Sequence, residues 1–221
     1  MPKVNLGYVA EKKKSIVDAA IKVCKSKPVY TVTLRDVVKE CGISQGGLYH
    51  YFKDIDEIFA EILNRYFAEN RMDEAEYKIF ESGKPLDEII AASFAALGQL
   101  IDDMVNQYGS LIYELNSIYL NEPERVEKIT NRITNHSDME TLFDKTFSLI
   151  EAHITSGDLA LAVSIEQLKL LVDVTMQGVQ QFVTFSQKFN NNKEHTTARD
   201  MMIILAHSIN GLLMYEVKNN G

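Results

Sequence analysis

Apolar residues recur at helical spacing along almost the whole chain, and few helix-breaking residues interrupt them. The clearest case is the set Leu34, Val37, Val38 and Cys41, which occupies positions i, i+3, i+4 and i+7 on one helical face. Only 11 Gly and 4 Pro occur among 221 residues, and most of them mark the points between periodic segments. The pattern therefore predicts an all-α fold. The one strand-like run, residues 29–32, is too short and isolated to build a sheet.

Capping residues define where several of these helices begin and end. Thr33 is a natural N-cap with Asp36 three residues on, and Gly42 is a natural stop. Ser44 is a second N-cap that opens a very short helical segment. We expect helices at residues 9–25, 34–41, 45–51, from 54 to about 66, 86–108, 110–120, 124–155, 165–189 and 196–218.

Charge is distributed unevenly along the chain. The formal net charge is -8, yet residues 1–53 hold ten Lys/Arg and four Asp/Glu, which gives +6 and leaves -14 for the remainder. A small basic head on a large acidic body suits a protein whose one end approaches a polyphosphate. A solvated, lysine-rich first helix would give the same count, so charge alone leaves both interpretations open.

Cysteine content and hydropathy limit the cellular compartments in which we expect the protein. The two cysteines, Cys24 and Cys41, are too few for a disulfide scaffold, and we expect small core residues rather than thiol sensors. The N-terminus lacks the apolar region of a secretion signal. The longest uncharged apolar run, residues 201–215, is shorter than the roughly 18–20 residues that cross a bilayer. These features predict a cytoplasmic protein without a membrane span.

Residues 33–52 carry the motif with the clearest chemical meaning. They form a helix, a tight glycine turn and a second short helix, which is a helix-turn-helix. Its apolar residues would pack both helices against the first one and leave the N-terminal end of the second free to enter a major groove. Gly46 and Gly47 are poor helix formers, costing roughly 1 kcal/mol each relative to Ala. They would let the backbone approach DNA closely, although a packing requirement would explain them equally well.

The stretch from Gly42 to Lys53, followed by an acidic and apolar fourth helix, resembles the DNA-binding domain of the tetracycline-repressor-like (TetR) family of bacterial transcriptional regulators. The resemblance covers about a quarter of the chain. It implies an N-terminal three-helix helix-turn-helix domain, a larger C-terminal helical ligand-binding and dimerisation domain, and usually repression that a small molecule relieves. We accordingly expect the first domain at residues 1–70 and the second at 71–221.

The resemblance also implies which residues touch DNA. Carried over by position, base edges would be faced by Gln45, Gly46 and His50, and phosphates would be held by Thr33, Ser44, Tyr49 and Lys53. The chemistry agrees, because a Gln amide pairs bidentately with adenine and hydroxyl groups donate to phosphate oxygens. Thr33 and Ser44 could instead serve only as helix caps, and Tyr49 could mainly pack.

The last two expected helices, 165–189 and 196–218, are apolar around much of their circumference. A helix needs one apolar stripe for its own core, so the surplus predicts a second buried face. Together with the resemblance, it predicts a homodimer built on a four-helix bundle, which would present two heads to a palindromic operator in double-stranded DNA. A helix buried on all sides within one chain is the alternative.

A pocket for a small-molecule effector is expected among the helices of residues 86–189. The candidate lining residues are polar side chains beside apolar stripes: Tyr108, Tyr113, Glu114, His153, Gln177 and Gln180. A buried, ionised Glu114 would favour a cationic effector, because a buried charge demands a partner. Each of these side chains could equally be a core residue whose polar group is satisfied within the chain.

Two other classes of function remain as alternatives. Residues 42–46 match the G-x-S-x-G pattern of a serine hydrolase with Ser44 as nucleophile, but that elbow requires a preceding strand, and residues 34–41 have helical periodicity. Glycine-rich cofactor motifs and metal-ligand spacings are absent, so we expect no enzyme, cofactor or metal. A helical protein-interaction module without specific DNA binding is the other alternative, and the basic head weighs against it.

Overall fold

The computed structural model describes residues 6–115, 122–189 and 196–215, and helices dominate it, as the sequence predicts. Contacts divide the chain into two compact units. The first unit contains residues 1–69 and 108–135, and the second contains residues 70–107 and 136–221. Each unit has a core of its own.

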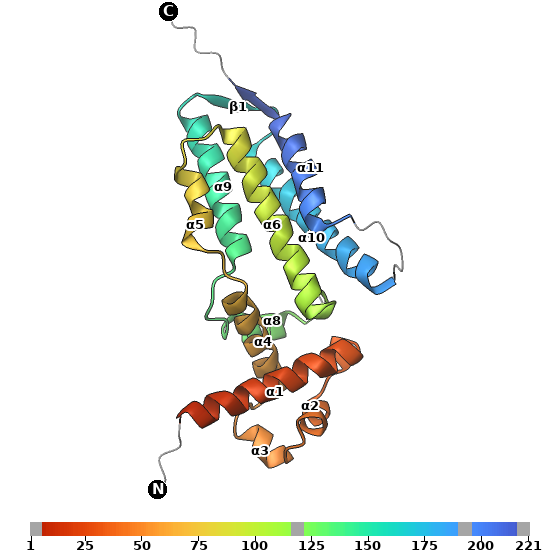
Figure 1. Cartoon of the computed structure of the whole chain (residues 1–221). Helices are drawn as coiled ribbons and strands as arrows, with labels where there is room; N and C mark the ends of the chain where they lie inside the picture. Colours follow the sequence, from red (N-terminus) through yellow and green to blue (C-terminus); the bar gives the residue numbers. More distant parts are fainter. Residues whose placement is uncertain (1–5, 116–121, 190–195, 216–221) are drawn as a thin grey trace, which may run out of the picture. The chain divides into compact units, whose positions relative to one another are not determined.

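The first unit begins with the three helices that the motif predicts, and Figure 1 shows the long first helix packed over the two short ones. The strand-like run at residues 29–32 forms a turn of 3-10 helix instead of a strand. Residues 111–115 are also helical. The elements of this unit are α1 (Leu6–Ser26), η1 (Val29–Thr31), α2 (Leu34–Cys41), α3 (Gln45–Tyr49), α4 (Ile55–Glu69) and α8 (Pro123–Thr130).

Residues 108–135, which the sequence assigned to the C-terminal domain, join the first unit through polar contacts. Arg125 of α8 binds the buried carboxylate of Asp56 at the start of α4, with Nη2 2.6 Å from Oδ1. Farther along α4, the side-chain amide of Asn64 donates to the carbonyl of Arg132, and its oxygen accepts from the Thr134 amide. Breaking a buried ion pair by removing one partner typically costs about 3–5 kcal/mol, so these contacts fix α8 to α4.

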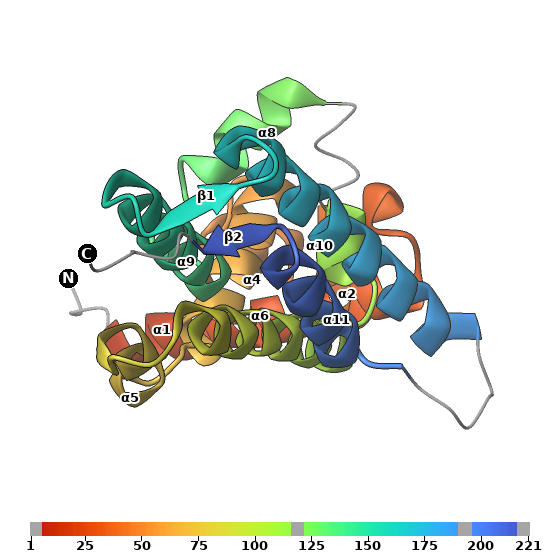
Figure 2. The ribbon, with the colours of Figure 1, turned by 90° about the horizontal axis from the view of Figure 1, so that it is seen from above.

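The second unit is a helical bundle with one small sheet. Its largest fully buried side chains come from residues 86–108 and 138–155 and include Phe94, Leu97 and Phe147. Figure 2 shows the two short strands side by side, and they pair antiparallel with Leu159 opposite Tyr215. The elements are α5 (Glu74–Tyr77), η2 (Lys78–Glu81), α6 (Leu86–Tyr108, its last residue in the first unit), α9 (Asp138–Thr155), β1 (Leu159–Leu161), α10 (Ile165–Phe189), α11 (Ala198–Asn210) and β2 (Leu213–Tyr215).

Helices α6 and α11 approach each other unusually closely at Gly98. A Cβ atom at this position would overlap the backbone of Arg199 and lie 2.7 Å from its nitrogen, so only glycine fits. One turn along α6, the carboxylate of Asp102 accepts hydrogen bonds from the backbone amides of Ala198 (2.8 Å) and Arg199 (3.1 Å). These amides begin α11 and have no partner within their own helix, so α6 both approaches α11 and caps it.

Two helix boundaries predicted from the sequence are wrong. The expected helix at 124–155 is two helices, because residues 131–137 leave the helical path, the loop bonds to Asn64, and Ser137 caps a new helix at Asp138. The expected helix at 196–218 begins at Ala198 and ends at Asn210, and the chain then forms β2. Residues 216–218 lie outside the described residues. The apolar residues after Asn210 form strand pairs, which a helical periodicity count cannot distinguish in so short a run.

Over residues 6–115, 122–189 and 196–215, no helix combines the length and the apolar character that crossing a membrane requires.

Candidate nucleic-acid interface

The turn between α2 and α3 is built by the capping residues that the sequence identifies. Thr33 and Asp36 form a capping box at the start of α2, in which the Asp36 carboxylate accepts from the Thr33 amide at 2.8 Å. Gly42 ends the helix with φ of +66°, a left-handed conformation that favours glycine, and its amide donates to the carbonyl of Val38. The predicted caps and the predicted stop are confirmed.

Helix α3 is short and is held from both ends. The hydroxyl of Ser44 accepts from the amide of Gly47 at 3.1 Å, and this bond starts the helix. Leu48 is completely buried, and Phe52 just beyond the helix is 3% exposed. These two apolar side chains anchor α3 on the core and therefore turn its remaining residues outward.

The seven residues that the family resemblance places at DNA are all exposed. Tyr49 is the largest, with 48% of its surface accessible, and the ring of His50 lies edge-on to that of Tyr51 at 5.3 Å. Six of the seven lie between residues 44 and 53, within or beside α3, and one lies at the start of α2: Ser44, Gln45, Gly46, Tyr49, His50 and Lys53, with Thr33. The exposed face of α3 thus carries donors, an amide and an aromatic ring together.

The two capping hydroxyls differ in what they can still bind. Thr33 Oγ1 donates to the Asp36 carboxylate at 2.7 Å and accepts from the Asp36 amide at 3.4 Å, so both of its functions are in use. Ser44 Oγ accepts from Gly47, and the structure shows no acceptor for its own proton among the described residues. Ser44 therefore keeps a donor for a phosphate, whereas Thr33 has to break a bond to supply one.

The two glycines of α3 also differ. A Cβ atom at Gly46 would meet no atom within 4 Å, so nothing within the described part of the chain requires glycine there. A Cβ atom at Gly47 would lie 3.1 Å from Ser44 Oγ, which is tighter than ordinary contact. Packing against the cap explains Gly47, and it leaves Gly46 without an explanation inside the molecule.

The positive charge around the motif is only partly neutralised by neighbouring acids. Lys27 Nζ lies 2.8 Å from Asp36 Oδ2, and this contact, with the bonds from Thr33, lowers the pKa of Asp36 to about 2. Arg35 and Lys53 are exposed and have no ion pair with any described residue. Arg35 enters the sequence-based prediction only through the charge balance, although its place two residues after the Thr33 cap is a signal that could have identified it as a candidate.

A second exposed aromatic residue beside the motif, Tyr30, is absent from the predicted DNA contacts. Tyr30, in the turn before α2, has 72% of its surface exposed and lies three residues before the Thr33 cap. A tyrosine with an exposed ring and hydroxyl next to a helix-turn-helix can donate to a phosphate. Apolar periodicity does not single it out, because it belongs to no helical stripe.

Ser44 and the two cysteines lie in surroundings that do not suit a catalytic nucleophile. Ser44 follows helix α2 and a glycine turn, so it lacks the preceding strand of a hydrolase elbow. Cys24 is 2% exposed, and burial raises the pKa of its thiol to about 12. Burial also raises the pKa of Cys41. Both thiols are therefore protonated at neutral pH and poor nucleophiles.

The six candidate effector residues are divided between the two units. In the first unit, Tyr108 is 2% exposed and donates to Glu69 at 3.3 Å, and burial raises its pKa to about 12. Glu114 in the same unit accepts from the Val29 amide and the Ser110 hydroxyl, both at 2.8 Å. Tyr113, half-buried, also belongs to the first unit, and three residues belong to the second: His153, Gln177 and Gln180.

The three candidates in the second unit are half-buried or exposed and mostly have partners in the bundle. Gln180 Nε2 lies 3.7 Å from the sulfur of Met104, and Gln177 Nε2 donates to Asp173 at 3.2 Å. The backbone carbonyl of His153 accepts from the Asp158 amide at 3.1 Å. None of these three residues lines either of the two clefts described for this unit below.

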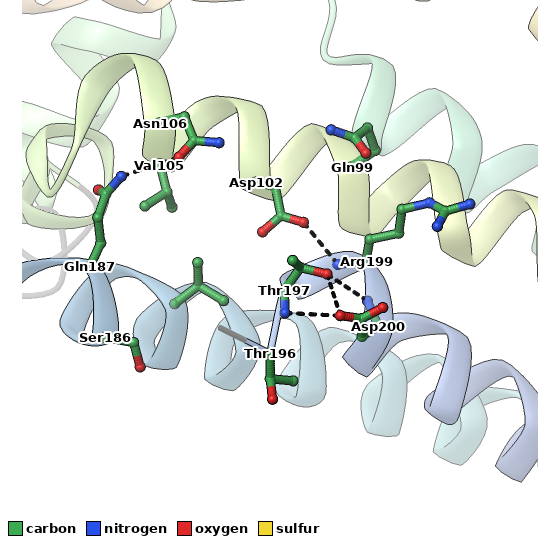
Figure 3. A pocket seen from close by; sticks show the side chains of 11 residues that line it. Gln99, Asp102, Val105, Asn106, Ser186, Gln187, Thr196, Thr197, Arg199 and Asp200 are labelled. Atoms are coloured by element: carbon green, nitrogen blue, oxygen red, sulfur yellow. Dashed lines mark hydrogen bonds between the residues drawn. The ribbon is translucent and has the colours of Figure 1, made fainter. Parts of the chain in front are cut away.

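A polar cleft of about 640 Å³ lies between α6, α10 and the start of α11 (Figure 3). Hydrogen bonds already join the walls of this cleft. Asp102 accepts from the first amides of α11, and the side-chain amide of Gln187 donates to Asn106 at 3.2 Å. Thr197 and Asp200 form a capping box on the same wall. Much of the hydrogen-bonding capacity of this cleft is thus used within the protein.

The comparisons with known proteins agree on the class of the N-terminal domain. Residues 16–62 match the family model described as bacterial regulatory proteins, tetR family. The chain is 35% identical over 83 residues to the uncharacterized HTH-type transcriptional regulator YfiR of Bacillus subtilis (strain 168), a match that spans 38% of each chain.

Solved structures extend the likeness to the whole fold. A putative TetR-family transcriptional regulator from Rhodococcus sp. superposes with a TM-score of 0.59 at 14% identity, covering 90% of this chain and 98% of the other. The transcriptional regulator FadR from Bacillus subtilis, solved in complex with stearoyl-CoA, superposes with a TM-score of 0.54 at 15% identity, covering 90% and 96%. The helix-turn-helix domain thus matches the TetR family in sequence, and the helical architecture is similar to that of solved TetR-family regulators.

Proposed function

We propose that this protein is a transcriptional regulator that acts in the cytoplasm, binding a palindromic operator as a homodimer and leaving it when a small molecule binds. The observation that carries the proposal is the outer face of α3, where exposed donors surround a glycine that nothing inside the described chain requires. Buried Leu48 holds this helix on the core, so its exposed N-terminal half is free to enter a major groove.

Within this interface we assign separate tasks to base and phosphate contacts. Gln45 and His50 reach base edges, and Gly46 lets the helix backbone approach the groove. Phosphates are held by Ser44, Tyr49 and Lys53, to which we add Arg35 and Tyr30. Thr33 acts mainly as a cap, because both functions of its hydroxyl are in use.

A second copy of the chain is proposed to cover the outer face of α10. The four side chains Leu171, Val174, Phe182 and Phe185 are each 46–57% exposed and form one stripe, while Val172 and Val179 on the inner face are buried. Ile204 of α11 adds an apolar side chain that is 65% exposed. Contiguous exposed apolar surface of this kind marks an interaction site, and two such helices per copy make a four-helix bundle.

The dimer is tested by the molar mass in solution. Phe182→Glu should give a monomer, because a two-fold interface loses the residue twice and burying a Phe contributes about 1.5–3 kcal/mol each time. We expect the dimer to weaken roughly 100-fold or more, measured by sedimentation equilibrium. Ser148→Glu places the same charge on an exposed position of α9 and should leave the mass unchanged. A Phe182→Glu protein that stays dimeric would show that the interface lies elsewhere.

DNA binding is tested by selecting duplexes from a random pool with the wild-type protein. We expect an inverted repeat and an affinity that falls steeply with salt concentration. Lys53→Ala should reduce the slope of log affinity against log salt by about 1 for each contact removed, whereas Lys84→Ala, an exposed lysine of the second unit, should not. Tyr49→Phe keeps the ring and removes the hydroxyl, so a loss in this variant assigns the contact to that oxygen.

Selection that enriches no duplex at any salt concentration would overturn the regulator proposal. The exposed face of α3 would then have to bind something other than DNA. This result would favour the alternative that the protein is a helical protein-interaction module. Effector release is supported by the relative solved with stearoyl-CoA. The selected operator is the reagent with which release by candidate molecules is measured.

A further inference from the structure

A groove of about 570 Å³ runs between α9 and α10 in the second unit, separate from the residues discussed above. Its apolar lining consists of Met139 and Phe143 from α9 and Leu170 and Met176 from α10. Phe143 is held in place by the buried ring of Phe147, whose centroid is 4.5 Å away. A fixed aromatic ring beside two methionines gives a surface that accommodates apolar groups of varied shape.

Three carboxylates line the same groove. Asp173 accepts a bond from Gln177 of its own helix, whereas the carboxylates of Glu140 and Asp144 have no hydrogen bond or ion pair with any described residue. Glu140 and Asp144 are four residues apart on α9, and like charges at that spacing destabilise a helix by roughly 0.2–0.5 kcal/mol. Glu140 also lies in the first turn of α9, where the helix dipole favours a negative charge, so helix stability accounts for Glu140 but not for Asp144.

The groove contains one lysine, and its charge is already neutralised. Lys169 Nζ lies 2.6 Å from Glu151 Oε1, outside the groove lining, and 5.8 Å from the centre of the Phe147 ring. The ion pair with Glu151 thus uses the charge of the ammonium group within the protein. Three carboxylates therefore determine the electrostatic potential in the groove. The potential is negative, and the surface beneath the carboxylates is apolar.

The groove and the proposed dimer face lie on different sides of α10. At 100° per residue, Lys169 and Met176 project nearly opposite to Phe182 and Phe185. Only Leu170, which is 62% exposed, lies toward the border between the two surfaces. A second copy on the outer face thus leaves the groove open to a ligand.

We infer that the groove between α9 and α10 binds an organic cation with an apolar body, its charge facing Glu140, Asp144 and Asp173 and its apolar part lying on Phe143 and the two methionines. Such a cation satisfies the unpaired acids, covers the exposed apolar surface and makes a cation–π contact with Phe143. A neutral apolar molecule would leave the carboxylates unused, and an anion would be repelled. A role of this cation as the effector rests on the proposed function above. Its binding to the groove does not depend on DNA.

The test compares two ions of nearly equal size and opposite charge, tetraphenylphosphonium and tetraphenylborate, by isothermal titration calorimetry on the full chain. We expect the phosphonium ion to bind, the borate not to bind, and the affinity for the phosphonium ion to fall with added salt. Equal binding of both ions would overturn the proposed preference for a cation, because the interaction would then be purely apolar.

Variants locate the site. Glu140→Gln together with Asp144→Asn should weaken phosphonium binding about 5- to 10-fold, and Phe143→Leu about 2- to 5-fold, as expected for exposed charge and cation–π contacts. Glu74→Gln with Glu81→Gln removes the same charge from exposed positions outside the groove and should change nothing. Unfolding curves check that the groove variants remain folded. An affinity that the groove variants do not lower would place the binding elsewhere and overturn the inference.

The final arm adds the selected operator. Release of the operator by phosphonium, lost in the double variant of the groove, would identify the groove as the effector site. Binding without release would confirm the groove and refute its role as the effector site. The calorimetric result stands whether or not any duplex is bound, so failure of the groove and failure of the regulator proposal are distinguishable.

Discussion

Gly46→Ala should stabilise the protein slightly and weaken its binding to DNA. The φ of Gly46 is not positive, and an added Cβ would touch nothing within 4 Å, so alanine fits the folded chain without strain. Alanine in place of an exposed helical glycine contributes about 0.5–1 kcal/mol. At the DNA the same methyl group would occupy the space that our proposal gives to the groove wall. Overpacking a close contact costs about 1–3 kcal/mol, which is roughly 5- to 150-fold in affinity for each half-site.

Two measurements on each variant decide the outcome. Stability is followed by urea unfolding with far-UV circular dichroism at fixed protein concentration, since the chain contains no tryptophan. Affinity is followed by fluorescence anisotropy with the selected operator at fixed salt concentration. We expect a higher urea midpoint and an affinity at least about 5-fold lower.

The neighbouring glycine is the matched control. Gly47→Ala places a Cβ 3.1 Å from Ser44 Oγ and should disturb the cap, at a cost of up to about 1 kcal/mol of stability. The two variants add the same methyl group to adjacent residues and gain the same helix propensity, so Gly47→Ala should be less stable than Gly46→Ala by up to about 1 kcal/mol. A Gly46→Ala protein that binds the operator with wild-type affinity would refute the close approach of α3 to DNA.

Two further predictions concern the stability of each unit. In the first, the contact with Lys27 and the bonds from Thr33 hold the pKa of Asp36 at about 2, below its ordinary value, so their stabilisation is present above about pH 4 and is lost as pH falls toward 2. Because a third of the Asp36 side chain is exposed, we expect Asp36→Asn to cost about 1 kcal/mol in urea unfolding at pH 7 and much less at pH 2.5, and an equal cost at both pH values would contradict the electrostatic origin. In the second unit, Gly98→Ala should cost about 1–3 kcal/mol, because its Cβ meets the backbone of α11. Ser148→Ala, at an exposed position of α9, is the control, and equal midpoints would show that α6 and α11 can separate freely.

The elements that local chemistry determines could be predicted from the sequence. The start of α2 at Thr33, its end at Gly42 and the cap at Ser44 depend on residues within four positions of one another. Helix α10 has the bounds that its periodicity predicts, because its 25 residues give seven turns of signal. The end of α11 could not be predicted, because residues 213–215 pair with a strand more than fifty residues earlier, and local periodicity does not contain that information.

The candidate effector residues show the same limit for polar side chains. Glu114 lies between apolar residues at helical spacing, which is the pattern of a carboxylate directed into a binding pocket. Its actual partners include the amide of Val29, 85 residues away, which begins the turn before the helix-turn-helix. Asp102 likewise holds the first amides of α11, 96 and 97 residues away. In both cases the carboxylate satisfies backbone groups that have no partner in their own segment.

A carboxylate in a helical protein is therefore available to a ligand only where no unsatisfied backbone amide lies opposite it. Glu114 and Asp102 face such amides and are used within the fold. Glu140 and Asp144 face the long α10, at positions where its amides are already bonded within the helix, and so they keep their capacity to accept. The sequence alone cannot separate these two kinds of acid, because the distinction depends on whether a helix start or a helix middle packs against them. For this reason the search for an effector begins at the groove between α9 and α10.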